Sequence, residues 1–280
     1  VSRLRRRGRD TQVTGTHALR SGVSRLEIAR PAGFTHRPGD YVFLCVPAIA
    51  KHEWHPFTLS NAPENPTLCI HVRSLGNWSA ALREWVEHRR TAEVTDPVAV
   101  QIDGPYGSPS THIFESRHAV LIGAGIGVTP FASVLESIVL RASLLDQRPT
   151  ELRKVHFFWL NRDQYSFEWF AALLAELETI DHRDLLEVHI CMTGGRGGAT
   201  AAGLEVAREI LHEAGQRDLV TGLRAMTHMG HPDWKSTLSR IAERHAPEAV
   251  DVYFCGPKGL GRKLRRLCAE LGMGYREEQF

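Results

Sequence analysis

Residues 118–131 read H-A-V-L-I-G-A-G-I-G-V-T-P-F, and this stretch decides the fold of the C-terminal half of the chain. The apolar run at residues 119–122 predicts a buried strand, which ends at the first of three alternate glycines, Gly123, Gly125 and Gly127. Thr129 and Pro130 then open a predicted helix, whose apolar face consists of Phe131, Val134, Leu135, Ile138 and Val139. A strand, a glycine turn and a helix bring N–H groups and a positive helix end to a phosphate, so we predict a pyrophosphate site. The alternative is a tight turn between packed elements, because Pro130 stands where the dinucleotide-binding fingerprint has its third glycine.

The composition limits the classes of function. The 280 residues leave room for two domains, and the net charge of +2 with a pI near 8.4 gives no general case for nucleic acid. The five cysteines form no C-x-x-C pair, and no His/Cys spacing is typical of a metal site, so we expect a reducing compartment and no metal. No apolar run approaches the roughly 18 residues of a membrane span and no signal peptide opens the chain, so we expect a soluble region.

Arginines are concentrated in the first ten residues, at Arg3, Arg5, Arg6, Arg7 and Arg9. Such a run is either a solvated, disordered terminus or a juxtamembrane segment that follows a missing membrane helix.

The two halves of the chain differ in their predicted secondary structure. Residues 12–111 contain short strands separated by turns, which predict a small antiparallel β-barrel. One helix interrupts them near residues 78–86, with Asn77 or Ser79 as its cap, and a turn at residues 103–107 closes the barrel. After about residue 112, strands alternate with helices, which predicts a doubly wound parallel sheet.

Several strand ends carry candidate binding residues. The segment H-P-F-T-L-S at residues 55–60 can present a ring-binding edge, although the same pattern also suits an ordinary strand start. His71 and Arg73 form a basic pair ahead of a helix N-terminus, which suits a second phosphate. Arg162 either selects NADPH by pairing with a ribose 2'-phosphate or makes a surface salt bridge. Cys255 either borders a ligand or is a small buried hydrophobe.

With these motifs in order, the chain resembles the dehydrogenase region of NADPH oxidases, and most closely the calcium-regulated branch of that family. The resemblance covers nearly the whole chain. It is carried by R-P-G-D-Y at 37–41, E-W-H-P-F-T-L-S at 53–60, H-V-R-S-L-G-N-W-S at 71–79, D-G-P-Y-G-S-P at 103–109, the glycine stretch, N-R-D-Q-Y-S-F-E-W-F at 161–170, T-G-L-R at 221–224, F-C-G-P at 254–257 and the terminal R-E-E-Q-F.

The resemblance implies a fold like that of ferredoxin-NADP reductases, with an FAD-binding barrel over residues 1–112 and an NADPH-binding α/β domain over residues 113–280. It implies that FAD is held by His55, Pro56, Phe57, Thr58, Ser60, His71, Arg73, Trp78 and Ser79. NADPH is then held by Gly123, Gly125, Gly127, Thr129, Pro130, Arg162, His231, Cys255, Gly256 and Pro257. Thr58 and Cys255 border the reacting rings, together with Phe280, which resembles the family's C-terminal aromatic stacked on the flavin where the nicotinamide enters.

Two departures from the family pattern matter. The family usually has Gly-Arg-Pro where this chain has Gly230-His231-Pro232, so one cationic contact to the nucleotide depends on pH and NADPH preference rests more on Arg162. The family's haem-bearing membrane helices are absent, and no EF-hand loop occurs. We therefore expect a transmembrane haem domain as partner, the arginine run as a stub that contacts the membrane, and a location at its cytosolic face.

These features lead to a hypothesis of hydride transfer from NADPH to FAD, followed by one-electron steps to haem and oxygen that give superoxide. In this hypothesis Phe280 is a gate and no side chain acts as a general acid or nucleophile. The rivals are a ferric or metal reductase dehydrogenase domain, a soluble ferredoxin-reductase-like enzyme and a redox-inert nucleotide-sensing module. The identity of the electron acceptor distinguishes the first rival from the oxidase, and flavin binding distinguishes the oxidase from the last.

Overall fold

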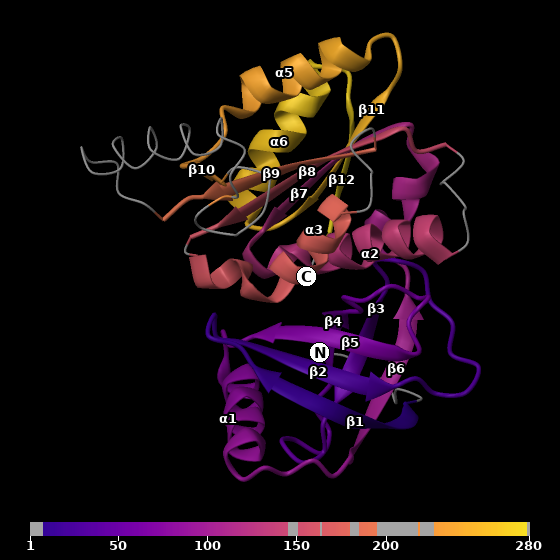
Figure 1. Cartoon of the computed structure of the whole chain (residues 1–280), viewed down its shortest axis with the longest axis vertical. Coiled ribbons are helices and arrows are strands. Elements are labelled where there is room, and N and C mark those ends of the chain that lie inside the picture. The colour runs from indigo at the N-terminus through magenta and orange to yellow at the C-terminus, as the bar shows by residue number, and fades with distance from the viewer. Residues whose placement is uncertain are drawn as a thin grey trace.

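The computed structural model describes residues 8–144, 151–162, 164–179, 185–194, 218 and 227–278. Its strands form two six-stranded sheets, which Figure 1 shows as two lobes arranged along the long axis of the molecule. Strands β1 to β6 build the first sheet and β7 to β12 the second, so the chain completes one sheet before it begins the other. The short 3-10 helix η1 (Pro109–Glu115) connects them.

The N-terminal sheet is antiparallel, in the order β4-β3-β6-β1-β2-β5. Its strands are β1 (Arg9–Ala18), β2 (Val23–Ala29), β3 (Tyr41–Cys45), β4 (His55–Thr58), β5 (Thr67–Arg73) and β6 (Val98–Tyr106). The inward side chains form one core, which α1 (Asn77–Thr91) completes with Trp78, Leu82 and Val86. The expected antiparallel barrel is confirmed as a near-barrel, because Ser60 N–H donates to the Cys69 carbonyl at 2.9 Å and brings the ends of the sheet together.

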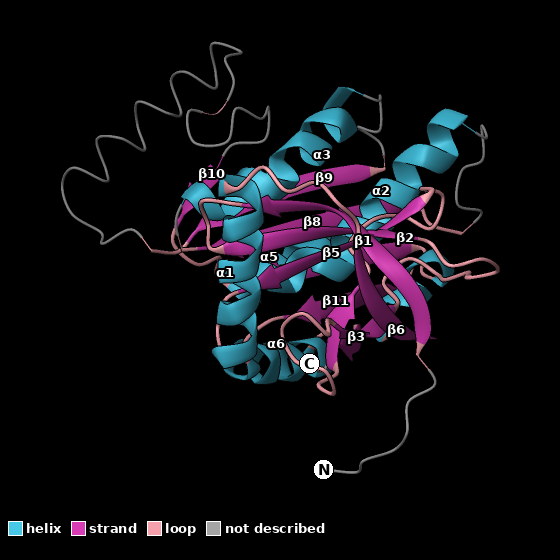
Figure 2. Cartoon of the chain, turned by 90° about the horizontal axis from the view of Figure 1, so that it is seen from below, coloured by secondary structure: helices cyan, strands magenta, loops and turns pink. Residues whose placement is uncertain are grey.

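The C-terminal sheet is parallel, in the order β10-β9-β8-β7-β11-β12, so the expected doubly wound sheet is confirmed. Its strands are β7 (His118–Ala124), β8 (Lys154–Asn161), β9 (Leu186–Met192), β10 (Thr227–Met229), β11 (Val250–Cys255) and β12 (Gly274–Glu277). Helices α2 (Thr129–Leu144) and α3 (Glu168–Thr179) cover one face, while α5 (Trp234–His245) and α6 (Lys258–Glu270) cover the other, as Figures 1 and 2 show.

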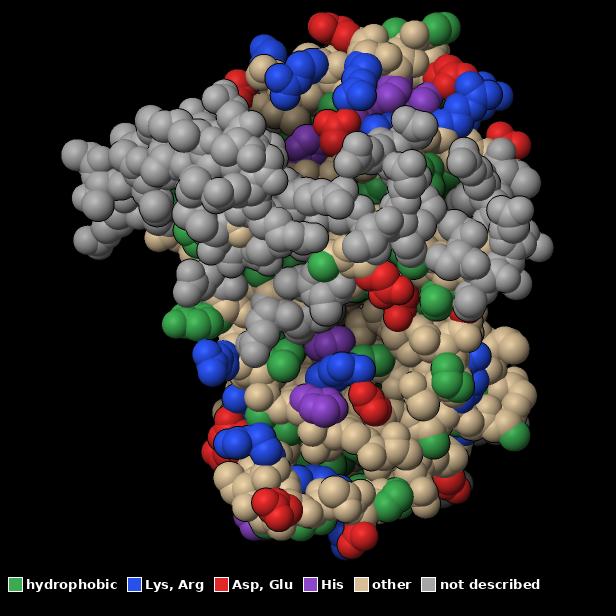
Figure 3. Space-filling model, in the orientation of Figure 1, with side chains coloured by type: hydrophobic (Ala, Val, Ile, Leu, Met, Phe, Trp, Pro, Cys, Tyr) green, Lys and Arg blue, Asp and Glu red, His purple; other side chains and the backbone are tan. Residues whose placement is uncertain are grey.

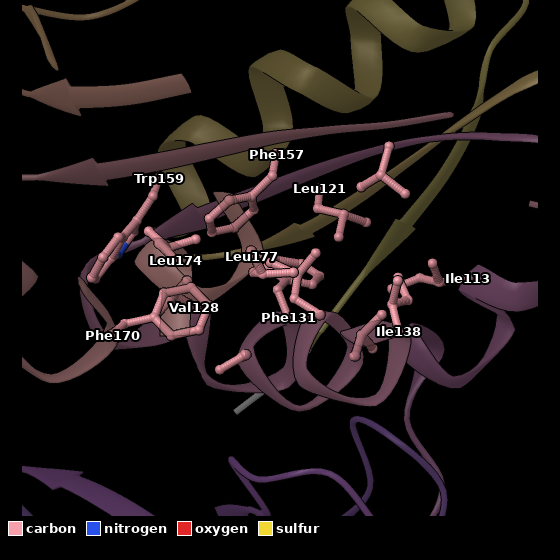
Figure 4. Packing of buried hydrophobic residues seen from close by; sticks show 14 of the residues in the cluster. Ile113, Leu121, Val128, Phe131, Ile138, Phe157, Trp159, Phe170, Leu174 and Leu177 are labelled. Carbon is pink, nitrogen blue, oxygen red and sulfur yellow. The ribbon is translucent and has the colours of Figure 1, made fainter. Parts of the chain in front are cut away.

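Strand β7 lies inside both layers of helices, which explains its uninterrupted apolar sequence. Because alternate side chains point to opposite faces, Leu121 joins the core beneath α2 and α3, whereas Ile122 joins the core beneath α5 and α6. Figure 4 shows the first of these cores, in which Phe131 of α2 packs beside Leu121 and Phe157. The apolar face predicted for this helix is entirely buried. Each such side chain contributes roughly 1.5–3 kcal/mol when fully buried.

Two local predictions were wrong, and one strand was missed. The cap of α1 is Gly76, and Ser79 occupies the third helical position. Residues 103–107 do not form a turn, because β6 continues to Tyr106, which pairs with Tyr41 after a register shift. The four-residue edge strand β12 was missed, since Gly274–Glu277 is too short and too polar to show a strand period.

All five cysteines are free and buried. In the part of the chain that the structure describes, we find no helix both long enough and apolar enough to cross a bilayer.

Candidate functional site

The glycine turn lies at the carboxyl end of β7, where the sequence predicted it. Gly125–Val128 form one 3-10 turn, η2, which continues directly into α2. Gly125 has a φ of +60°, a conformation that glycine adopts without a steric penalty. Trp159 of β8 donates its indole N–H to the Gly125 carbonyl at 3.3 Å. The start of α2 therefore lies at the edge of the sheet where parallel strands place their ligands.

The glycine turn packs directly against the end of β11. A Cβ on Gly127 would lie 2.5 Å from the carbonyl oxygen of Cys255, and a Cβ on Gly256 would lie 2.8 Å from the Cβ of Ala124. Both distances are shorter than van der Waals contact, so only glycines allow the two strand ends to approach this closely. The predicted neighbours Gly127, Cys255 and Gly256 are therefore brought together.

A cavity of about 770 Å³ lies at the junction of the two lobes, beside these strand ends. The glycine turn and the C-G-P segment line one side, and Arg73, from the end of β5, lines the other. The Nη1 atom of Arg73 is 3.3 Å from the position of a Cβ on Gly125, so this side chain reaches across the junction to the turn. We call this space the junction cavity; it is lined by Arg73, Leu75, Ala124, Ile126, Gly127, Cys255, Gly256, Pro257, Lys258, Arg262, Arg265, Glu277 and Glu278.

The lining of the junction cavity carries an excess of positive charge, with three arginines and one lysine against two glutamates. One of these arginines, Arg265, pairs with Glu277 at 2.7 Å. Glu278 accepts hydrogen bonds from the backbone and the hydroxyl of Ser110, but burial raises its pKa more strongly than these bonds lower it. The remaining cations Arg73, Lys258 and Arg262 make the cavity suitable for a polyanionic ligand.

The thiol of Cys255 is not a nucleophile in this site. Its side chain is buried, and burial raises its pKa above the ordinary range. A neutral thiol beside Gly127 contributes shape and an apolar surface rather than reactivity.

A cluster of three rings connects β4 with the start of α1. The ring centres of His55 and Trp78 are 4.3 Å apart, and those of Phe57 and Trp78 are 5.7 Å apart. Pro56 between them is exposed, whereas Thr58 is buried at the end of the strand. The structure therefore brings together His55, Phe57 and Trp78, which the resemblance assigned to one flavin site.

His71 and Arg73 do not form the predicted basic pair. His71 lies with Ser60 and Glu136 on a separate cavity of about 290 Å³, and its Nδ1 is 2.7 Å from Ser60 Oγ. Burial, together with the nearby charge of Arg25, lowers the pKa of His71 to about 3. This histidine is consequently neutral at physiological pH, so it adds no positive charge to that of Arg25 in its own cavity or of Arg73 in the junction cavity.

Ser79 has a role that the sequence analysis did not foresee. Its hydroxyl oxygen accepts hydrogen bonds from the N–H groups of Leu75 and Gly76, at 3.0 and 2.9 Å, and donates to the Gly76 carbonyl. It therefore fixes the turn that precedes α1. The first turn of this helix carries no acidic residue, so its positive end remains available to an anion.

The remaining predicted residues lie apart from the junction cavity or outside the described residues. Arg162 is exposed directly after β8, at the same sheet edge as the glycine turn. His231 follows β10 and lines a third cavity of about 550 Å³, which lies beneath α5. Thr129 and Pro130 are buried in the first turn of α2, and Gly123 is buried in β7. Phe280 and the T-G-L-R motif lie outside the described residues.

Sequence reasoning missed five charged residues of the junction cavity. Lys258, Arg262 and Arg265 lie on α6, which follows the C-G-P motif, while Glu277 ends the missed strand β12 and Glu278 follows it. The position of Lys258 directly after the motif was an available signal. The two glutamates belong to the terminal R-E-E-Q-F motif, but that motif gave no sign that the pairing of β12 with β11 brings them to the cavity.

Two protein families together match most of the chain. Residues 11–110 match the family described as "FAD-binding domain", and residues 116–269 match "Ferric reductase NAD binding domain". Among curated proteins, NADPH oxidase 5 of Homo sapiens is 38% identical over 94% of this chain and 41% of its own length. NADPH oxidase 3 of Homo sapiens is 39% identical over 89% of this chain and 43% of its own length. The chain thus spans less than half of these relatives.

Solved structures agree on the fold. A ferredoxin NADP+ reductase from Neisseria gonorrhoeae with bound FAD and NADP has a TM-score of 0.61 at 12% identity, with 96% of this chain and 98% of that chain covered. The CS-b5R domains of human Ncb5or have a TM-score of 0.63 at 16% identity, with 99% of this chain and 71% of that chain covered. At these identities the likeness shows the architecture alone, and that architecture agrees with the expected barrel and α/β domain.

Proposed function

Because this chain belongs to the NADPH oxidase family and comprises its FAD-binding and NAD-binding dehydrogenase region, we propose that it oxidises NADPH for a membrane-bound oxidase. FAD, held by the N-terminal lobe, would supply the ability to take up a hydride from NADPH and to release the two electrons one at a time. In this proposal the electrons pass to haem in a transmembrane domain and then to oxygen, which gives superoxide. The protein's own contribution is to position the two cofactors.

The junction cavity is the observation that carries this proposal. It lies between the lobe that matches an FAD-binding domain and the lobe that matches an NAD-binding domain, and both contribute to its lining. Gly127, which has no side chain, lets the glycine turn pack against Cys255 at the edge of the cavity, and Arg73, Lys258 and Arg262 supply charge for phosphates. The residues present therefore suit a dinucleotide in this cavity.

On the flavin side we assign ring and ribityl contacts to His55, Pro56, Phe57 and Thr58, and pyrophosphate contacts to Arg73 and the start of α1. Trp78 orders the ring cluster and Ser79 orders the turn before the helix. Ser60 and His71 act together through their hydrogen bond, so His71 supports the strand without contributing charge.

On the nucleotide side we assign the NADPH pyrophosphate to the glycine turn, through Gly123, Gly125, Gly127, Thr129 and Pro130. We assign the nicotinamide to Cys255, Gly256 and Pro257, which would border it. We assign the 2'-phosphate to Arg162 and, more weakly, to His231, and the gate at the flavin to Phe280.

We further propose the place of the region in the whole protein. The domain boundary falls near residue 112, within η1, and the region lies at the cytosolic face of a membrane. Arg9 already belongs to β1 and stacks on Phe34 at 5.6 Å, so membrane contact is assigned to Arg3, Arg5, Arg6 and Arg7 only.

Anaerobic stopped-flow absorbance at 450 nm tests the dehydrogenase step. The protein receives excess FAD and then NADPH, with NADH run in parallel. Rapid bleaching by NADPH and slow bleaching by NADH is the expected result. Flavin that binds but is not bleached refutes NADPH oxidation by this region, and a protein that binds NADPH but no flavin is a sensing module.

A second candidate, ferric reduction, follows from the description of the family that matches residues 116–269. It differs only in the acceptor, so the test requires the full-length protein in membranes. A superoxide signal that disappears when superoxide dismutase is added supports the oxidase. Reduction of a ferric chelate without superoxide supports the reductase.

A further inference from the structure

Two histidines and a glutamate converge on one face of the C-terminal sheet, away from the junction cavity. His156 lies on β8, while Glu187 and His189 lie on β9. His156 pairs in register with Glu187, and His189 follows two positions later, so all three side chains point to the face covered by α5. Figure 1 shows α5 above β8 and β9, and Figure 3 shows histidine side chains beside Lys, Arg, Asp and Glu side chains in that part of the molecule.

The spacing of the three groups matches that of metal ligands. His156 Nδ1 is 3.6 Å from Glu187 Oε2, and His189 Nε2 is 3.2 Å from Glu187 Oε1. One ligand atom from each residue lies within 4.8 Å of the other two. Ligands at about 2.0–2.1 Å from a tetrahedral zinc ion are about 3.3 Å apart, so small side-chain adjustments close the site around a cation.

Two buried nitrogens in this cluster have no hydrogen bond to explain them. His156 is only 1% exposed, yet its Nδ1 has no hydrogen-bond partner within the described part of the chain. The same holds for His189 Nε2, whose distance to the carboxylate is short but whose geometry is not that of a hydrogen bond. Since buried polar nitrogens are almost always satisfied, both point to a missing partner between them.

The surroundings hold the two imidazoles in the orientation that a metal needs. His156 Nε2 lies 2.8 Å from Nε2 of His245, so an N–H on the distal nitrogen leaves Nδ1 with a free lone pair. The ring of His189 stacks on Phe158, with centres 4.2 Å apart and planes 9° apart. Ligating histidines are commonly oriented by such outer contacts.

The competing interpretation is a set of ion pairs around Glu187. This carboxylate contacts Arg244 at 2.9 Å and Lys154 at 3.8 Å, and Arg240 lines the same cavity. These cations satisfy the glutamate, but they leave the two nitrogens unsatisfied. They also lower the affinity for a cation, so they argue for a weaker site than one with three ligands and no positive neighbours.

We propose that His156, Glu187 and His189 bind a divalent transition-metal ion of the zinc type, with a fourth position open to the cavity beneath α5. Two imidazoles and one carboxylate are ligands that zinc accepts, and three protein ligands leave one position for water. The site lies on the opposite face of the sheet from α2, and His231, to which we assign a weaker 2'-phosphate contact, lines the same cavity.

Zinc titration of the whole chain, first stripped with EDTA, tests the proposal by competition with a chromophoric chelator. We expect one equivalent per chain, with the affinity lowered at least about tenfold in His189→Ala and in Glu187→Gln. His88→Ala removes an exposed histidine of α1 and serves as the matched control, with unchanged affinity. Cobalt provides a second readout, because a tetrahedral site gives visible absorption that these two variants abolish.

Circular dichroism shows whether each variant is folded, and Glu187→Gln provides the test where His189→Ala does not fold. Absence of a stoichiometric zinc ion overturns the proposal. Unchanged affinity in either folded ligand variant also overturns it.

Discussion

The contact between Gly127 and Cys255 gives the sharpest test of the junction cavity. In Gly127→Ala the new methyl group would lie 2.5 Å from the Cys255 carbonyl oxygen, 2.9 Å from its carbon and 3.1 Å from its sulfur. An ordinary contact begins near 3.4 Å, so the two strand ends must separate by about 0.9 Å. The nearest atoms belong to the backbone, which cannot rotate away as a side chain does.

Two consequences follow from this separation. Overpacking of this kind costs about 1–3 kcal/mol of the free energy of unfolding, and each kcal/mol lowers Tm by about 2–4 °C in a chain of this size. A displacement near 1 Å at a reacting centre also slows a reaction by about 100-fold. We therefore expect a Tm lower by several degrees and a rate of flavin reduction by saturating NADPH lower by about 10- to 100-fold.

The matched control is Gly259→Ala, in the first turn of α6, where an added Cβ meets nothing within 4 Å. It makes the same chemical change near the same segment, and it should leave the rate unchanged and Tm equal or slightly higher. Stopped-flow absorbance and thermal melting are measured for both variants. A Gly127→Ala protein with the wild-type rate and Tm refutes the claim that the close approach of the strand ends is required.

Four further predictions concern single side chains. Arg73→Ala removes a cation from the junction cavity and should weaken FAD binding by about 10- to 100-fold, since a hydrogen bond to a charged group contributes about 1.5–3 kcal/mol; flavin fluorescence titration measures this, and an unchanged dissociation constant for FAD contradicts it. Arg162→Ala should lower kcat/KM for NADPH by a similar factor and leave NADH nearly unaffected, so equal losses with both nucleotides argue against a 2'-phosphate contact. Burial and the nearby Arg30 lower the pKa of His36 to about 4, below its ordinary value of 6.5, so the unfolded chain binds more protons between these values and stability falls as pH falls through this window. In His36→Phe the free energy of unfolding should depend less on pH, by an amount that corresponds to at most about one bound proton. Urea unfolding at pH 7 and pH 5 measures this, and a pH dependence equal to that of the wild type contradicts the lowered pKa. Phe280→Ala should raise nicotinamide occupancy and the hydride-transfer rate, and unchanged single-turnover kinetics exclude a gate.

Short-range patterns predicted the parts of the site that one segment builds. The strand, glycine turn and helix at residues 118–144 were predicted from the spacing of apolar residues and the positions of the glycines. The structure confirms all three elements. The same holds for the apolar face of α2, which is entirely buried. Local sequence was sufficient in these cases because each element specifies its own geometry.

Properties that depend on a distant partner were not predictable. The neutral state of His71 depends on its burial beside Ser60 and beside Glu136 of α2, which lies 65 positions later in the chain. The cluster of His156, Glu187 and His189 depends on the register of two parallel strands, so no short spacing in the sequence marks it. Sequence patterns therefore identified the candidate residues better than the charge that each one carries.

Helix α2 explains how the two halves of the site are held at a fixed separation. It begins at the glycine turn, and its next turns contact the loop that follows the H-P-F-T-L-S segment. Ser133 Oγ donates to the Asn61 carbonyl at 2.8 Å, Glu136 accepts the Ala62 N–H at 2.5 Å, and Glu64 accepts from Ser137 at 2.9 Å. Glu136 and Ser137 lie three and four positions after Ser133, which places all three on one face of the helix. Because one helix joins the turn proposed for NADPH to the loop beside the proposed flavin strand, the separation of these two segments is set largely by secondary structure rather than by a flexible linker.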